Sequence, residues 1–305
     1  MLGPSILKAF IVGSAAGGGY PQWNCRCDVC VLYWQKDPRV KRRTQSSIAV
    51  SSDGKDWALI NCSPDIREQT SNSPELHPQG GLRHSPIKTV VLTNADVDHI
   101  GGLLSLREGH SFTVWASKSV LQQLRSNDIF AVLNPGLVTL NEILPGNLFS
   151  PLSGLTMSSF DVPGKVPLYQ ETGIIPNVSR SGHAIGLHIR TAGERLSYVP
   201  GCGAIDLQLR SDLATTDTLL FDGTVWKDDE MQTAGVGSKT GRRMGHIPVS
   251  GDDGSVQGLQ SLKARRRIFI HLNNTNPLLV EGSPERQHVE AMGWEVGFDG
   301  MKVMP

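Results

Sequence analysis

The sequence lacks an excess of charge and lacks long apolar runs. Its 305 residues include 29 Lys and Arg and 29 Asp and Glu, so nothing indicates a nucleic acid or an acidic membrane as a partner. No stretch approaches the roughly 18 uninterrupted apolar residues that a membrane-spanning helix needs. The apolar run at residues 6–12 is short and contains Lys8, which does not fit a secretion signal. We therefore expect a cytoplasmic protein without a membrane span.

Cysteine is also scarce. The chain has five, and three of them lie close together as Cys25-Arg26-Cys27-Asp28-Val29-Cys30. A disulfide framework would space its cysteines apart, whereas this spacing is typical of thiolates that converge on one zinc ion in a reducing compartment. Structural zinc has four ligands, so one more must come from elsewhere. We predict a zinc-binding insertion at about residues 20–32, with three buried or redox-active cysteines as the alternative.

A dinucleotide-binding motif is missing as well. The glycine-rich turn at residues 13–19 follows a predicted strand at 6–12, but it does not have the spacing Gly-x-Gly-x-x-Gly and no helix pattern follows it. With 39% apolar residues, the chain is long enough to bury a sizeable core. We expect a single α/β domain over residues 1–305.

A polar cluster is present directly after a predicted strand. The β-branched run 87–92 indicates a buried strand, and the residues that follow it include Asp96, Asp98 and His99. These groups cannot all be buried without a partner, because burying unpaired charge costs several kcal/mol. A metal cation is the partner that we expect. The alternative is a solvated loop in which Asp98 caps the helix predicted over residues 100–107.

Other polar residues also follow predicted strands. His271 comes after an apolar run, as His99 does, with a core or capping histidine as the alternative. Asp222 follows another such run. The glycine-rich stretch of residues 224–256 contains His246 and has little periodicity, which is typical of a lid over an active site or of a disordered segment.

The polar cluster resembles the signature His-x-His-x-Asp-His of the metallo-β-lactamase superfamily. Asp98 and His99 match its last two residues, whereas Asn94 and Asp96 replace the first two histidines. The resemblance implies an α/β protein with the four-layer αββα sandwich of that superfamily. It also implies that half of the usual two-metal centre is missing.

Two further ligand positions of the superfamily are replaced. Lys165 stands where its hydrolases carry a third histidine, and Gly201 stands where they carry the aspartate that bridges both metals. His271 matches the last metal-binding histidine. Two-metal hydrolysis uses both cations to clamp the reacting oxygens, so these replacements argue against it in this chain. A mononuclear hydrolase, with Asp96 as a ligand or general base, stays open.

The cysteine trio resembles that of phosphodiesterases in the same superfamily. In those proteins a histidine three residues beyond the last metal-binding histidine completes the zinc site, and Asn274 occupies this place here. Asparagine is a poorer zinc ligand than histidine. The resemblance therefore makes Asn274 a weak fourth ligand through its carbonyl oxygen, with His246 as the alternative.

Over nearly the whole chain, the sequence resembles the coenzyme PQQ synthesis protein B family. The motifs that carry the resemblance are Cys25-x-Cys27-x-x-Cys30, Asn94-Ala-Asp-Val-Asp-His99, Leu220-Phe-Asp-Gly-Thr224, Met244-Gly-His-Ile-Pro248 and His271-Leu-Asn-Asn-Thr-Asn-Pro277. The resemblance implies a cytoplasmic protein of pyrroloquinoline quinone (PQQ) biosynthesis, a pathway that builds the cofactor from a Glu and a Tyr of a peptide. Proteins of this family are described as iron-dependent hydroxylases of that tyrosine, or as carriers that move the cofactor or its precursor to the periplasm.

The matching residues favour the hydroxylase. Asp98, His99 and His271 form the 2-His-1-carboxylate set that holds Fe(II) and leaves positions open for oxygen and substrate. We therefore predict Fe(II) at this site, with a peptide or Glu-Tyr precursor of PQQ as the substrate. The candidates for positioning or deprotonating the phenol of that tyrosine are Asp96, Asp222 and His246.

Two other functions stay open. A carrier would bind PQQ without turnover, and a hydrolase would act on phosphodiester or thioester substrates with zinc or manganese. The sequence also leaves a homodimer open.

Overall fold

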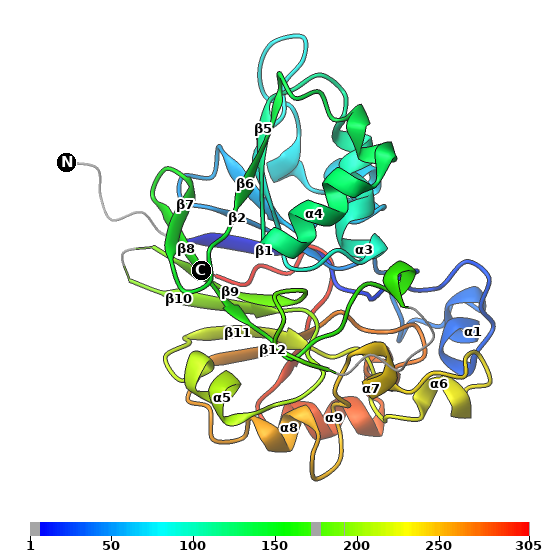
Figure 1. Ribbon diagram of the computed structural model, residues 1–305. Coiled ribbons are helices and arrows are strands. Elements are labelled where there is room, and N and C mark those ends of the chain that lie inside the picture. The colour runs from blue at the N-terminus through cyan, green and yellow to red at the C-terminus, as the bar shows by residue number, and fades with distance from the viewer. Residues whose placement is uncertain (1–6, 172–177, 192, 305) are drawn as a thin grey trace.

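The computed structural model describes residues 7–171, 178–191 and 193–304, and two β-sheets form its centre (Figure 1). The first sheet has the strand order β1-β2-β3-β4-β5-β6, and the second has the order β13-β12-β11-β10-β9-β8-β7. The strands are β1 (Lys8–Gly13), β2 (Ser47–Ser51), β3 (Trp57–Ile60), β4 (Ile87–Leu92), β5 (Phe112–Ala116), β6 (Val138–Glu142), β7 (Leu148–Leu152), β8 (Leu155–Asp161), β9 (Ile185–Arg190), β10 (Arg195–Val199), β11 (Thr218–Asp222), β12 (Arg266–Ile270) and β13 (Glu295–Val296).

Three apolar clusters show how the layers are stacked. One cluster lies between the sheets and joins Val91 of the first sheet to Leu187 of the second. Another packs the outer face of the first sheet against α2 and α4, and the last packs the outer face of the second sheet against α5, α8 and α9. These helices are α2 (Ile66–Asn72), α4 (Lys118–Ser126), α5 (Leu207–Leu213), α8 (Ser255–Gly258) and α9 (Pro284–Ala291). The predicted four-layer αββα sandwich is confirmed.

Strand β4 illustrates how the sequence produces these layers. Val91 packs into the core between the sheets, whereas Val90 and Leu92 pack towards the outer helices, because successive side chains of a strand face opposite sides. Both faces of the strand are covered, so it is apolar almost throughout. Lys88 is the one residue of β4 that is partly exposed. The buried strand predicted there is confirmed.

Parallel pairing brings the functional segments to one edge of the sandwich. Strands β3 to β6 run parallel in the first sheet, and β10 to β13 run parallel in the second. The carboxyl ends of parallel strands lie at the same edge, where α/β proteins place their ligands. A bridge between Ala15 and Leu272 links the two sheets just beyond β12. The segment after β4 and the ends of β11 and β12 therefore meet.

The segment after β4 differs from its prediction. Residues 100–107 do not form one α-helix, because α3 (Val97–Ile100) is followed by a 3-10 helix, Gly101–Leu106. A Cβ on Gly102 would lie 2.1 Å from the carbonyl oxygen of Ser63, so only glycine fits at this close approach of two backbone segments. Glycine in turn weakens an α-helix. Asp96 occupies the N-cap of α3, so the alternative in which Asp98 caps a helix is wrong.

The segment 224–256 contains two short helices, α6 (Glu230–Thr233) and α7 (Gly241–Met244). In Figure 1 they lie on the same side of the molecule as α1 (Asp28–Trp34). Within the described part of the chain, no helix is long and apolar enough to cross a membrane.

Candidate active site and cysteine cluster

A cavity of about 510 Å³ opens where the segment after β4, the end of β12 and the segment 224–256 meet. Its lining combines carboxylates, ammonium groups and imidazoles with apolar side chains. The polar members that matter below are Asp96, Asp98, Lys165, Lys239, His246 and His271.

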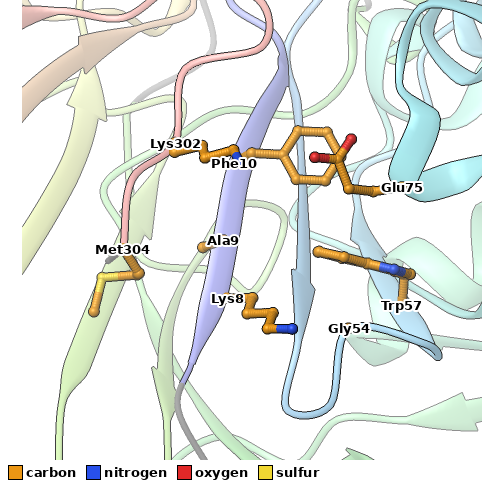
Figure 2. Close-up of a pocket in the computed structure, with 8 residues that line it drawn as sticks. All are labelled: Lys8, Ala9, Phe10, Gly54, Trp57, Glu75, Lys302 and Met304. Carbon is orange, nitrogen blue, oxygen red and sulfur yellow. The ribbon is translucent and has the colours of Figure 1, made fainter.

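Another hollow, of about 270 Å³, lies beside β1 and shares no lining residue with the first. Figure 2 shows Lys8 and Phe10 on β1, with Lys302 and Met304 on the C-terminal segment next to it. Its lining contains neither histidine nor cysteine. It therefore does not offer the ligand set of a transition-metal site.

Three side chains converge beside the larger cavity. His271 Nε2 lies 3.1 Å from Asp98 Oδ2, and His99 Nε2 lies 3.9 Å from the same oxygen. His99 Nε2 is buried and has no hydrogen-bond partner among the described residues, although buried polar atoms almost always have one. A cation between the three groups would supply that partner, and two imidazoles with one carboxylate suit iron or zinc.

The electrostatics of these groups suit metal binding. Burial lowers the pKa of His99 to about 4, so its imidazole is neutral near pH 7 and offers a lone pair. Burial opposes ionisation of Asp98, but the neighbouring His99 and His271 outweigh it and lower the pKa of Asp98. Burial likewise opposes protonation of His271, yet the hydrogen bond to Asp98 and the nearby carboxylates raise the pKa of His271. Bound metal would replace that proton.

Hydrogen bonds at the far nitrogen of each ring hold the two imidazoles. His99 Nδ1 lies 2.6 Å from Asn94 Oδ1, and His271 Nδ1 lies 2.8 Å from Thr224 Oγ1. Such bonds select the tautomer in which Nε2 faces the metal. His271 also has a φ of +59°, a conformation that is rare for a residue with a Cβ and that concentrates at functional sites. The support that Asn94 and Thr224 give to these two rings was not predicted from the sequence. The motif Asp222-Gly-Thr224 was the only signal for the role of Thr224.

Asp222 and His246 form a pair next to these ligands. His246 Nδ1 lies 2.7 Å from Asp222 Oδ2, and the His246 ring stacks on His271 with 5.1 Å between centroids. Asp222 is fully buried and also accepts from the backbone N–H groups of Cys202 and Thr224 at 2.8 and 3.0 Å. Asp222, His246 and His271 form a second candidate ligand set, but the oxygens of Asp222 are already occupied. Asp222 therefore orients His246, which lines the cavity while Asp222 does not.

Asp96 lies on the cavity wall rather than in the ligand cluster. Burial and the charge of Asp98 raise its pKa, and the charge of Lys165 works in the opposite direction. The structure thus places Asp96 where it would face a substrate and Lys165 on the same cavity.

The three clustered cysteines place their sulfur atoms within 4.8 Å of one another. Cys25, Cys27 and Cys30 are all buried and free, and α1 begins directly after Cys27. Convergence of three thiols without a disulfide suits one zinc ion. The geometry suits the zinc binding predicted for this cysteine trio.

Asn274 lies against this cysteine cluster. Its Nδ2 is 3.2 Å from Cys25 Sγ and 3.4 Å from Cys30 Sγ, and its Oδ1 is buried without a hydrogen-bond partner in the described structure. A half-turn of the amide would direct Oδ1 at the sulfur atoms, where it would serve as a fourth ligand. The alternative fourth ligand, His246, is wrong, because its ring is bound to Asp222 at the other site.

Comparison with known proteins gives the family. The model of the beta-lactamase superfamily domain matches residues 56–272. Coenzyme PQQ synthesis protein B of Methylobacterium radiotolerans is 51% identical over 97% of this chain and 99% of its own length. The protein of the same name from Rhizobium meliloti is 48% identical over 98% of both chains.

Solved structures agree. Zn²⁺-bound PqqB from Methylobacterium extorquens matches with a TM-score of 0.96 and 50% identity over 98% of this chain and 100% of its own. A diphosphatase of the PhnP family matches with a TM-score of 0.68 and 20% identity over 98% of both chains, which supports the fold alone. The metallo-β-lactamase fold predicted from the motifs is confirmed, and this chain belongs to the coenzyme PQQ synthesis protein B family.

Proposed function

We propose that this chain acts in PQQ biosynthesis, where it hydroxylates the tyrosine ring of a Glu-Tyr precursor with Fe(II) and O₂. The observation that carries the proposal is the convergence of Asp98, His99 and His271 beside a cavity, with a buried His99 nitrogen that lacks a partner in the described structure. Such a set leaves adjacent positions of an ion free. The names of the relatives, one of them with bound Zn²⁺, support a role in this pathway and metal binding.

Fe(II) held by these residues would supply the redox chemistry with O₂ that zinc lacks. The overall reaction consumes O₂, two electrons from an external reductant and two protons, so that one oxygen atom enters the ring and the other leaves as water. The chain itself binds the precursor, positions the three metal ligands and accepts the proton of the phenol.

His246 is the group best placed to take that proton. Its Nδ1 is held by Asp222 and its ring lines the cavity, so Nε2 can accept from a substrate hydroxyl. Asp222 does not reach the cavity and acts as a positioning residue. Asp96, with its raised pKa, offers a second hydrogen-bonding group on the same wall.

We assign a structural zinc ion to Cys25, Cys27 and Cys30, with Asn274 as the weak fourth ligand. The free state of these cysteines supports the cytoplasm as the place of action, because its thiols stay reduced. The precursor peptide or PQQ itself, and a second copy of the chain, remain the predicted partners.

The test uses protein purified without oxygen, whose metal content is measured before a Glu-Tyr peptide, a reductant and O₂ are added. The wild-type protein should contain iron and yield a product heavier by one oxygen atom. His271→Ala should lose both the iron and the product. His188→Gln is the matched control, because His188 is a buried histidine of β9 that hydrogen-bonds Ser197 away from the site.

Iron-dependent turnover that persists in His271→Ala would refute the assignment. Tight binding of PQQ by wild-type protein without any turnover would favour the carrier. Hydrolysis of a phosphodiester by the zinc or manganese form would favour the hydrolase.

A further inference from the structure

The carboxylate of Glu171 is paired with three cations, two of which line the cavity described above. Glu171 Oε1 is 3.0 Å from Lys165 Nζ, and Glu171 Oε2 is 3.2 Å from Lys239 Nζ and 2.9 Å from Arg243 Nη2. Glu171 is the only ion-pair partner of these cations among the described residues. Residues 172–177, which lie outside the description, include no acidic side chain. Two positive charges are therefore left without an ion-pair partner.

Glu171 offsets only one of these positive charges. Hydrogen bonds from Arg243, Lys165 and Lys239 outweigh burial and lower the pKa of Glu171 to about 2, so this carboxylate is ionised at any working pH. Arg243 Nη1 is buried and has no hydrogen-bond partner in the described structure. Cations held partly out of water without a partner are unfavourable, so the cluster has capacity for one more anionic group.

The cluster faces the same space as the candidate metal ligands. Lys165, in the loop after β8, and Lys239, in the segment before α7, both line the cavity that contains Asp98 and His271. Asp96 acts on Lys165 through its charge, without an ion pair. Lys239 is 38% exposed, against 11% for Lys165, so its charge is the more available to a ligand.

We propose that Lys239, with Lys165 beside it, binds a carboxylate of the substrate and thereby selects a carboxylate-bearing amino-acid derivative. The identity of that substrate as a Glu-Tyr precursor rests on the function proposed above. Each ammonium group can donate to one carboxylate oxygen. Glu171, which Arg243 also binds, holds the two lysines in place. Charge-assisted hydrogen bonds of this kind are about twice as strong as neutral ones.

The experiment measures binding by calorimetry to the zinc-loaded protein without oxygen, so that no turnover is involved. Three ligands are compared, namely Glu-Tyr, Gln-Tyr and Glu-Tyr with an amidated C-terminus. Lys239→Met should weaken Glu-Tyr binding about tenfold or more. For the ligand that lacks the recognised carboxylate, the same substitution should change the affinity less than about twofold.

Two control variants accompany this comparison of ligands. Lys239→Arg should restore most of the affinity, which a merely steric role would not require. Lys55→Met, at an exposed lysine in the turn between β2 and β3, should bind all three ligands like the wild type. If Lys239→Met weakens all three ligands equally, or none of them, the proposal is overturned.

This outcome is separable from that of the proposed hydroxylation. Discrimination among the three ligands can hold even if no oxygenated product ever forms. Conversely, turnover without discrimination would remove the role of Lys239 and leave the hydroxylase intact.

Discussion

The cysteine cluster and the Asp98 site have opposite architectures. The cluster takes its thiols from the single stretch 25–30, and Asn274 covers its remaining side, so that all four side chains are buried. Asp98 and His271 are 173 residues apart in the chain, and they border a cavity. Zinc sites closed by protein ligands serve structure, whereas open positions serve chemistry. One fold thus offers a closed site at the cysteine cluster and an open site at Asp98, His99 and His271.

A short segment after β12 connects the two regions. His271 belongs to the open site, Asn273 lines its cavity, and Asn274 touches the cysteines. Thr275 Oγ1 then donates to Glu230 Oε1 at 2.5 Å. A metal ion at the cysteine cluster would therefore lie next to the segment that carries His271.

The largest effect is expected from Cys30→Ser, which removes a thiolate from the closed site. Zinc bound there should be lost, and the free energy of unfolding should fall by about 4 kcal/mol or more, as for other losses of a structural metal. Metal analysis and thermal unfolding measure both. Cys202→Ser changes an equally buried cysteine outside the cluster and should keep the zinc. Full zinc occupancy in Cys30→Ser would contradict the closed-site assignment.

An intermediate effect is expected from Glu230→Gln, which removes a carboxylate that lies between the two regions. Burial raises the pKa of Glu230 from 4.5 to about 7, so the folded state binds more protons than the unfolded state between these values. The contribution of Glu230 to the free energy of unfolding should therefore be greatest at low pH and fall by about 3 kcal/mol as the pH rises from 4.5 to 7. Glutamine does not ionise, so the substitution should remove this part of the dependence of the free energy of unfolding on pH.

Urea unfolding at pH 5 and pH 8 tests this prediction. Glu285→Gln, on the rim of the cavity that Glu230 and Cys27 also line, is the control and should retain the wild-type slope. An unchanged slope in Glu230→Gln would mean that Glu230 is not the group responsible.

The smallest effect is expected from Asn274→Ala. A weak ligand or supporting group near a metal contributes about tenfold to affinity, so the rate of zinc loss to a chelator should rise by about that factor while the fold is retained. Asn273→Ala is the neighbouring control, because its amide bonds Thr275 and Met231 rather than the cysteines. Identical zinc retention in both variants would leave the site with three protein ligands.

Local patterns predicted those features that depend on neighbours in the chain. The β-branched apolar run 87–92 predicted a buried strand, and the cysteine spacing predicted convergence of the three sulfurs. The prediction of one helix over residues 100–107 was wrong, because Gly102 approaches Ser63 in a contact between distant segments. The supporting hydrogen bond of Asn94 to His99 was likewise invisible, because the sequence marks Asn94 only as a replaced ligand.

The sequence by itself determined strands such as 87–92 and the cysteine cluster, because these follow from residue type and from short spacings, and its resemblance to the metallo-β-lactamase signature gave the candidate ligands. Only the tertiary structure decided that His246 pairs with Asp222 and not with the cysteines, and that Lys239 meets Glu171 beside the open site. Such pairings require atoms to approach within about 3 Å. The packing of the two sheets and the path of the segment 224–256 set those distances, and no local pattern encodes either.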